Sequence, residues 1–289
     1  MKHIRQIIYL LLAAVALTAL VPQTAMAQAQ INTKKVKISD FTEKTTKVVT
    51  TGNVFYDNVL KDEITARWRI SPFEFCSLKD FEELKENDNF YFLITTKGQF
   101  RRESEPGLQF LTLVKGGKKA ENGIDDMLEI VSIPLCSADS PSGRELLIIP
   151  AYLDIIQNFT LDSMEKDING YTGLANYTMN LADTKGLDVI ISEEDLGNDV
   201  DMEKIKSYER KGIKVLEEDD ADEYIINQTP GVLVSYVAAP TDAKPGSYCY
   251  KLLIDITNNR LCYFRKHRIS KKVGAGFLQE DIKRIAISR

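Results

Sequence analysis

The strongest constraint on the fold is an approximate internal repeat, with an offset of about 140 residues. Apolar residues 48–49 precede the segment 57–64, and apolar residues 189–191 precede the segment 198–205. Val and Ile occupy the same places in both segments, and each copy continues with an acidic segment, an apolar run and a Pro-Gly pair. The same order of patterns over most of the chain indicates a duplicated module.

Each copy shows the patterns of a strand, a helix, a strand, a short helix and then strands joined by hairpins. Alternating strands and helices are typical of an α/β fold, with α+β as the alternative. We therefore predict two tandem, weakly duplicated α/β modules with mixed sheets. The predicted organisation is a signal peptide over 1–27, a first module over 28–144, a linking helix and connector over 145–186, and a second module over 187–289.

Two helices can be predicted in more detail. Apolar residues recur at helical spacing over 150–167, and Pro150 suits the first turn of this linking helix. A shorter helix is expected over 221–226. Asp219 and Asp220 are expected to cap it, because a side-chain oxygen can accept the unpaired amides at a helix start.

The N-terminal segment has the features of a secretory signal peptide. Lys2 and Arg5 precede an apolar run over 7–21, and an A-x-A pattern ends at Ala27. The run is shorter than the ~20 residues that a membrane-spanning helix needs. We therefore predict cleavage near Ala27, a periplasmic or secreted location, and no transmembrane anchor after cleavage.

The net charge argues against two classes of partner. Cleavage would remove two basic residues and leave 35 basic and 42 acidic ones, which changes the net charge from −5 to −7. A mildly acidic protein has no general attraction to nucleic acid or to anionic lipid. We therefore expect no nucleic-acid partner.

The four cysteines are expected to be buried free thiols, because they lie in or beside apolar runs without CxxC spacing. A two-residue hairpin turn at 258–259 would separate Cys249 from Cys262 by about 20 Å, whereas a disulfide joins Cα atoms at most about 7 Å apart. That pair is therefore disfavoured. A bridge between Cys76 and Cys136 stays open.

Most catalytic chemistries lack the residues they need. His267 is the one histidine that remains after cleavage, so a zinc site built on several imidazoles is excluded. Phosphate-binding loops, H-E-x-x-H and G-x-S-x-G are absent from the sequence, and we predict no cofactor and no metal. A hydrolase based on two carboxylates stays possible, because such a pair has no fixed spacing. His267 itself, in a basic run, is expected to be an exposed strand residue.

Two acidic clusters have structural interpretations. Asp195, Asp199, Asp201 and Glu203 resemble a cation loop in residue type but lack the central glycine and the distal glutamate of an EF-hand. We interpret them as acids at a helix N-terminus, where the helix dipole favours negative charge. The acidic segment 217–223 is interpreted as a solvated turn and cap.

Six of the eight residues over 265–272 are basic or histidine. They could bind an acidic partner or a phosphorylated glycan, or they could protect an edge strand against aggregation. Nearby aromatic residues at 248, 250, 263 and 264 could form a carbohydrate-stacking face, although core packing is the simpler interpretation. The candidate binding residues are Arg265, Lys266, His267, Arg268, Lys271 and Lys272.

The segment 252–261, with a strand that ends in Asp, a turn and a second strand, resembles the small α/β modules of the TolB N-terminal type found in periplasmic envelope-assembly proteins. The chain after residue 27 also resembles uncharacterised secreted proteins of Bacteroidetes-type bacteria. The first resemblance implies a noncatalytic interaction role.

The leading functional hypothesis is therefore an exported, noncatalytic protein of the cell envelope that binds or assembles protein partners. The alternative is a glycan-binding or small-ligand-binding protein that uses a cleft between the modules or the tyrosine-rich hairpin. A carboxylate-based hydrolase ranks third.

Overall fold

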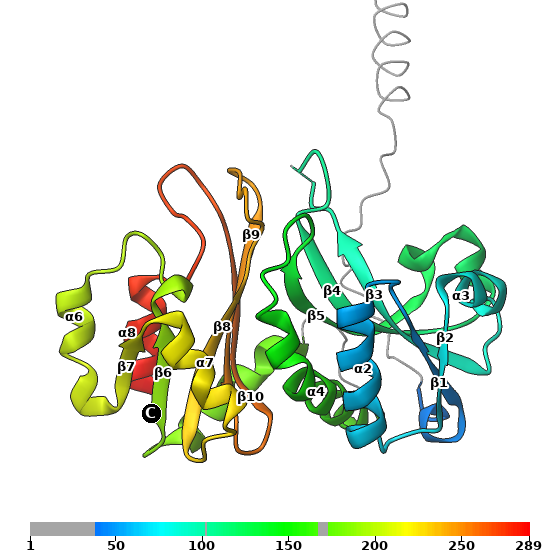
Figure 1. Ribbon diagram of the computed structural model, residues 1–289, viewed down its shortest axis with the longest axis horizontal. Helices are drawn as coiled ribbons and strands as arrows, with labels where there is room; N and C mark the ends of the chain where they lie inside the picture. Colours follow the sequence, from blue (N-terminus) through cyan, green and yellow to red (C-terminus); the bar gives the residue numbers. More distant parts are fainter. Residues whose placement is uncertain (1–37, 102, 167–172) are drawn as a thin grey trace, which may run out of the picture.

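Two five-stranded mixed sheets lie side by side and are joined by a long helix (Figure 1). This computed structural model describes residues 38–101, 103–166 and 173–289. The predicted signal peptide lies outside the described residues. None of the described helices is long and apolar enough to cross a membrane.

The first module contains β1 (Thr45–Val49), α2 (Val54–Arg67), β2 (Phe73–Cys76), α3 (Leu78–Leu84), β3 (Phe90–Gly98), β4 (Leu108–Lys115) and β5 (Leu128–Ser137). Its 3₁₀ helices are η1 (Phe41–Glu43), η2 (Lys118–Asn122) and η3 (Ile124–Asp126). The helix α4 (Glu145–Lys166) and the 3₁₀ segment η4 (Leu174–Thr184) follow.

The second module contains β6 (Asp188–Ser192), η5 (Glu193–Asp195), α6 (Met202–Lys206), η6 (Glu209–Lys211), β7 (Ile213–Leu216), α7 (Glu218–Ile226), β8 (Val232–Ala238), β9 (Tyr248–Asp255), β10 (Arg260–Arg268) and α8 (Gln279–Ser288).

The two sheets have the same topology. Their strand orders are β2-β1-β3-β4-β5 and β7-β6-β8-β9-β10. In each sheet the first three strands of the chain are parallel and the last two are added antiparallel. The prediction of two similar α/β modules with mixed sheets is confirmed, while the residue boundaries drawn between them stay predictions.

Helices cover both faces of each sheet, which explains why the central strands are apolar on both sides. In β3, Tyr91 and Leu93 face α2 and α4, whereas Phe92 and Ile94 face α3. In the second module α7 covers the inner face of the sheet, which faces the first module. The helices α6 and α8 cover the outer face, which is turned away from it. The helix α4 packs against α2, β5, α7 and β10, so one hydrophobic core runs through both modules.

Both predicted helices begin earlier than expected. The linking helix starts at Glu145, so Pro150 lies inside α4 and not in its first turn. The helix α7 starts at Glu218 after Glu217, so Asp219 and Asp220 lie in its first turn and do not cap it. Acidic residues still suit this turn because of the helix dipole.

The predicted hairpin exists, but its turn has four residues, 256–259, and Arg260 pairs with Asp255. The Asp255 carboxylate accepts hydrogen bonds from the Thr257 amide and from Asn258 Nδ2, both at 3.0 Å. The prediction of a two-residue turn was therefore wrong. The side-chain bonds of Asp255 stabilise the longer turn. All four cysteines are free, including the pair that the sequence left open, but Cys76 is half-buried and not buried as expected.

The edge of the second sheet is covered by η4, which lies along β10. The Thr178 hydroxyl oxygen accepts the Phe264 amide at 3.1 Å and lies 3.2 Å from the Phe264 carbonyl oxygen. Asn180 Nδ2 donates to the Leu261 carbonyl at 2.9 Å. Side chains of η4 thus satisfy backbone groups that would otherwise be open at this edge.

Candidate functional site at the carboxyl edge of the first sheet

The described part of the chain contains a pocket of about 660 Å³ at the carboxyl end of β1. The chain leaves β1 through α2 to reach β2 on one side, and then returns through α3 to reach β3 on the other side. Loops that leave in opposite directions create a crevice at the carboxyl ends of parallel strands, where α/β proteins bind ligands. The pocket occupies this position.

The floor of the pocket is the sheet, and its walls are the starts of α2, α3 and α4. Lys97, Gln109 and Cys136 stand side by side on β3, β4 and β5. Beyond the floor, the lining residues come from the end of β1, the starts of α2, α3 and α4, and neighbouring strands; they are Val49, Thr50, Thr51, Asn53, Phe55, Tyr56, Leu78, Ile94, Thr95, Leu135, Pro141, Ser142, Gly143, Glu145 and Leu146.

The start of α2 is already occupied by the protein's own acceptors. Asn53 caps the helix by accepting two amides of the first turn. The Asp57 carboxylate accepts the amides of Thr51 and Gly52 at 2.8 and 2.9 Å. These amides are therefore not available to a phosphate, although a helix N-terminus often binds one.

Glu145, the first residue of α4, is the carboxylate that lines the pocket. It is 5% exposed, and its Oε2 accepts the Gly143 amide at 2.9 Å and a longer bond of 3.5 Å from the Ser142 hydroxyl. Among the described residues, no lysine, arginine or histidine lies within ion-pair distance of it. Burying a carboxylate without a counter-charge is costly, so the pocket contains an uncompensated acceptor.

Two other groups in the pocket are held in their neutral forms. Burial raises the pKa of the Cys136 thiol to about 12, and Glu145 adds to the shift. Burial also raises the pKa of Tyr56 far above its usual 10.0, although its bond to Thr95 opposes the shift. Neither a thiolate nor a phenolate is therefore present at neutral pH.

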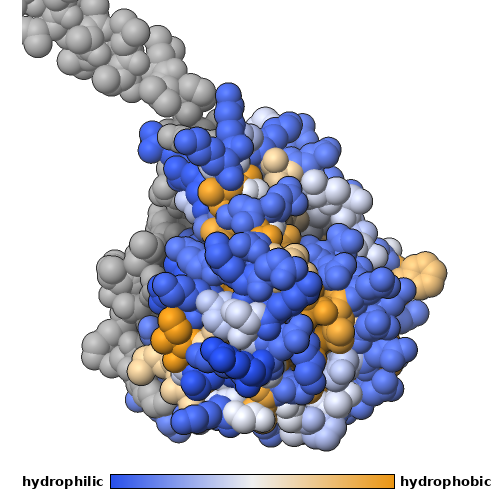
Figure 2. All heavy atoms as spheres, turned by 90° about the vertical axis from the view of Figure 1, so that its left-hand side faces the viewer, coloured by the Kyte–Doolittle hydropathy of each residue, from blue (hydrophilic) through white to orange (hydrophobic). Residues whose placement is uncertain are grey.

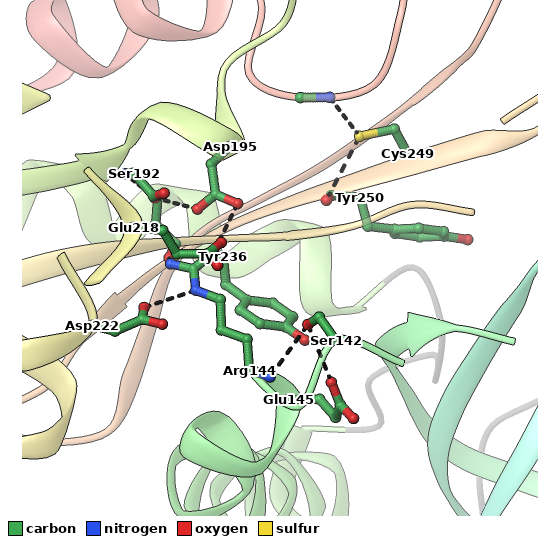
Figure 3. Close-up of polar contacts among 12 residues, drawn as sticks. Ser142, Arg144, Glu145, Ser192, Asp195, Glu218, Asp222, Tyr236, Cys249 and Tyr250 are labelled. Carbon is green, nitrogen blue, oxygen red and sulfur yellow. Dashed lines mark hydrogen bonds and ion pairs between the residues drawn. The ribbon is translucent and has the colours of Figure 1, made fainter. Parts of the chain in front are cut away.

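In the second module an arginine is buried at the carboxyl edge of the sheet, on the side of α7. Arg144 lies just before α4 but extends toward the carboxyl ends of β6 and β8, whereas the neighbouring Glu145 points the other way (Figure 3). Its Nε lies 2.7 Å from Asp222 and its Nη1 lies 3.0 Å from Asp195. The second sheet thus holds a buried cation at its carboxyl edge on the side of α7, whereas the pocket of the first module lies on the side of α2.

The groups around Arg144 stabilise its positive charge. Nη2 donates to the Ser235 carbonyl at 3.3 Å, and the guanidinium lies 5.6 Å from the centre of the Tyr236 ring. Burial opposes the charge on Arg144, but the two aspartates outweigh it and raise the pKa of the guanidinium. Burial raises the pKa of Asp222, although Arg144 opposes that shift.

The predicted basic binding residues are divided between two faces, because neighbouring residues of a strand point in opposite directions. Arg265 lies 3.1 Å from Asp281, and His267 Nε2 donates to the Gly274 carbonyl at 2.7 Å. Lys266 and Arg268 lie over the Tyr248 ring on the other face. Lys271 and Lys272 are exposed in the following loop. The binding role of the six residues stays a prediction.

Two interpretations of this region can be decided. His267 is half-buried and not exposed as expected, and burial lowers its pKa. Tyr250, Tyr263 and Phe264 are buried and pack in the core, whereas Tyr248 is half-buried beneath Lys266 and Arg268.

The acidic clusters are likewise only partly as expected. Asp201 caps α6 and Glu203 lies in its first turn, as interpreted. Asp195 and Asp222, in contrast, are buried and form ion pairs with Arg144, which the sequence did not indicate. In the described part of the chain, no group of three or more His, Cys, Asp or Glu side chains is arranged to hold a metal ion.

Comparisons with protein-family models, curated proteins and solved structures give no match to this chain. The resemblance to TolB-type modules therefore stays a prediction.

Proposed function

We propose that the protein is a noncatalytic binding protein of the cell envelope, and that the pocket at the carboxyl edge of the first sheet binds its ligand. The observation that carries the proposal is the pocket itself. Its volume of about 660 Å³ lies within the ~300–1,000 Å³ of typical ligand sites.

The lining residues support binding over hydrolysis. A glycosidase needs two carboxyl groups across the scissile bond, and Glu145 is the one carboxylate among the described residues that line the pocket. Cys136 keeps its proton at neutral pH and is therefore a poor nucleophile.

A protein partner is the second candidate, because exposed apolar side chains surround the mouth of the pocket. Phe55 is 80% exposed and Leu78 is 50% exposed, and both line the pocket. Val54, next to Phe55, is 67% exposed. By contrast, the outer face of the second module is mostly hydrophilic, with small hydrophobic patches (Figure 2).

The small-ligand proposal can be tested with the fluorescent probe 1-anilinonaphthalene-8-sulfonate, which has an apolar ring system and one acidic group. The chain without residues 1–27 should bind one equivalent with increased fluorescence. The variant Gln109→Trp, which fills the floor, should lose this signal, whereas Glu223→Trp on the exposed face of α7 should keep it. Equal probe binding by both variants would show that the pocket is not the site.

The proposed envelope location has its own test. Expression of the full chain in a bacterial host, followed by mass spectrometry of the periplasmic fraction, should give a protein that starts at Gln28. Recovery of the uncleaved chain from the cytoplasm would contradict the location.

A further inference from the structure

We infer that the ligand of this pocket is a short apolar peptide with free ends, whose ammonium group pairs with Glu145 and whose carboxylate pairs with Lys97. This inference rests on the proposed function and adds the chemical class of the ligand. It is carried by two charged side chains of opposite sign that lie in one pocket without partners of opposite charge.

The first charge is the buried Glu145 carboxylate, which has amide and hydroxyl donors but no cation. The second module shows how this fold compensates such a group, because Asp195 pairs there with Arg144 at 3.0 Å. In the first module the cation has to come from outside the described residues. An ammonium group provides the charge and donates up to three hydrogen bonds.

The second charge is Lys97, which lies on β3 beside Gln109. Its side chain is exposed and has neither a hydrogen-bond partner nor an ion-pair partner among the described residues. Glu145 belongs to the α4 wall of the pocket, and Lys97 belongs to its floor. A ligand with a positive and a negative end matches this arrangement, whereas a simple cation or a simple anion would leave one side chain unpaired.

The pocket lining also includes apolar side chains from three different elements, Tyr56, Leu135 and Leu146. The apolar Phe55 side chain lies at the entrance. Apolar side chains of the ligand would be removed from water here, which contributes about 25 cal/mol per Å² of buried surface.

The backbone of β3 favours a peptide over a single amino acid. Strand β1 pairs only with Phe90–Leu93, whereas β3 continues to Gly98. The Phe90 carbonyl accepts the Gly116 amide on the β4 side, so alternation along the strand directs the backbone groups of Thr95 and Lys97 toward the side of β1, beyond its end. An extended peptide can add to such an open edge by main-chain hydrogen bonds.

The experiment is displacement of 1-anilinonaphthalene-8-sulfonate by three dipeptides, Leu-Leu, Leu-Phe and Phe-Leu, followed by calorimetry with the best competitor. The same dipeptide with an acetylated N-terminus, and with an amidated C-terminus, removes one charge at a time. Each modification is expected to weaken binding about tenfold or more, since a hydrogen bond to a charged group contributes ~1.5–3 kcal/mol.

Matched variants show which side chain binds which end of the dipeptide. Glu145→Gln should weaken the free dipeptide but leave the affinity of the acetylated form unchanged, and Lys97→Gln should do the same for the amidated form. Lys97 is exposed, so its variant tests the idea even if Glu145→Gln impairs folding. Glu223→Gln, on the exposed face of α7, is the control.

The outcomes separate this inference from the proposed function. Probe binding that is lost in Gln109→Trp, but that no dipeptide displaces, would overturn the peptide and keep the pocket as a ligand site. Acetylated and free dipeptides of equal affinity would likewise refute the role of Glu145. Failure of the wild-type chain to bind the probe would count against the proposed function itself.

Discussion

Arg144 is expected to be the side chain whose loss destabilises the protein most clearly. Its side chain is 8% exposed, and the side chains of its partners Asp195 and Asp222 are 4% and 13% exposed. Arg144→Met keeps an aliphatic chain against Tyr236 but leaves two buried carboxylates without their cation. Breaking a buried pair in this way typically costs ~3–5 kcal/mol of unfolding free energy.

For a chain of this size, 1 kcal/mol corresponds to about 2–4 °C in Tm, so we expect Arg144→Met to melt about 6–20 °C below the wild type. Guanidinium chloride unfolding should be followed by far-UV circular dichroism and by the fluorescence of Trp68, the single tryptophan, which is 2% exposed. Because one core runs through both modules, the two signals should change together.

Two further variants separate charge from packing. Adding Asp195→Asn and Asp222→Asn to Arg144→Met should recover more than about 1 kcal/mol, because the uncompensated charges are removed. Lys214→Met is the control, since the side chains of its pair with Asp188 are 48% and 42% exposed, and such pairs contribute less than about 1 kcal/mol. The reasoning would be refuted if Arg144→Met stayed within 1 kcal/mol of the wild type, or if Lys214→Met cost as much.

Three other predictions follow from the core. Burial acts to raise the pKa of Asp281, but Lys251 and other donors outweigh it and hold this pKa below the usual 3.8. Its contribution to stability is therefore present above pH ~4 and lost as the pH falls further, and Asp281→Asn should remove this acid dependence in unfolding titrations from pH 2 to 5. Gly276→Ala should lower the unfolding free energy by ~1–3 kcal/mol, because Gly276 has φ +102° and an added Cβ would lie 2.5 Å from the backbone of Leu196; an unchanged denaturation midpoint would contradict this. Cys136, Cys249 and Cys262 are free and buried, and burial raises their pKa values, so mass spectrometry after iodoacetamide treatment should show these three modified only in denaturant, whereas the half-buried Cys76 should react first. Full labelling of the folded protein would argue against their burial.

The fold could be predicted because its signals are local. Apolar runs and Pro-Gly pairs mark the strands and turns, and their order is the same in both halves. Element ends were less predictable, because they depend on specific side chains. The Asp255 carboxylate stabilises a four-residue turn, and α4 begins at Glu145, well before the proline that suggested its start.

The site could not be predicted, because its residues come together only in the folded chain. Arg144 meets Asp195 and Asp222, which lie 51 and 78 positions further along the sequence. The pocket is lined by residues from both ends of the first module and from α4. One signal was present: the neighbouring opposite charges Arg144 and Glu145 lie at the start of an apolar helix, and charged side chains are seldom buried unless they are paired.

The cover that η4 provides for β10 also has a consequence for biosynthesis. During synthesis, residues 174–184 leave the ribosome before any strand of the second sheet, and β10 is the last strand to be made. The hydrogen-bonding side chains Thr178 and Asn180 are therefore already present when the open edge forms. Newly made chains should therefore have little opportunity to join edge to edge through β10.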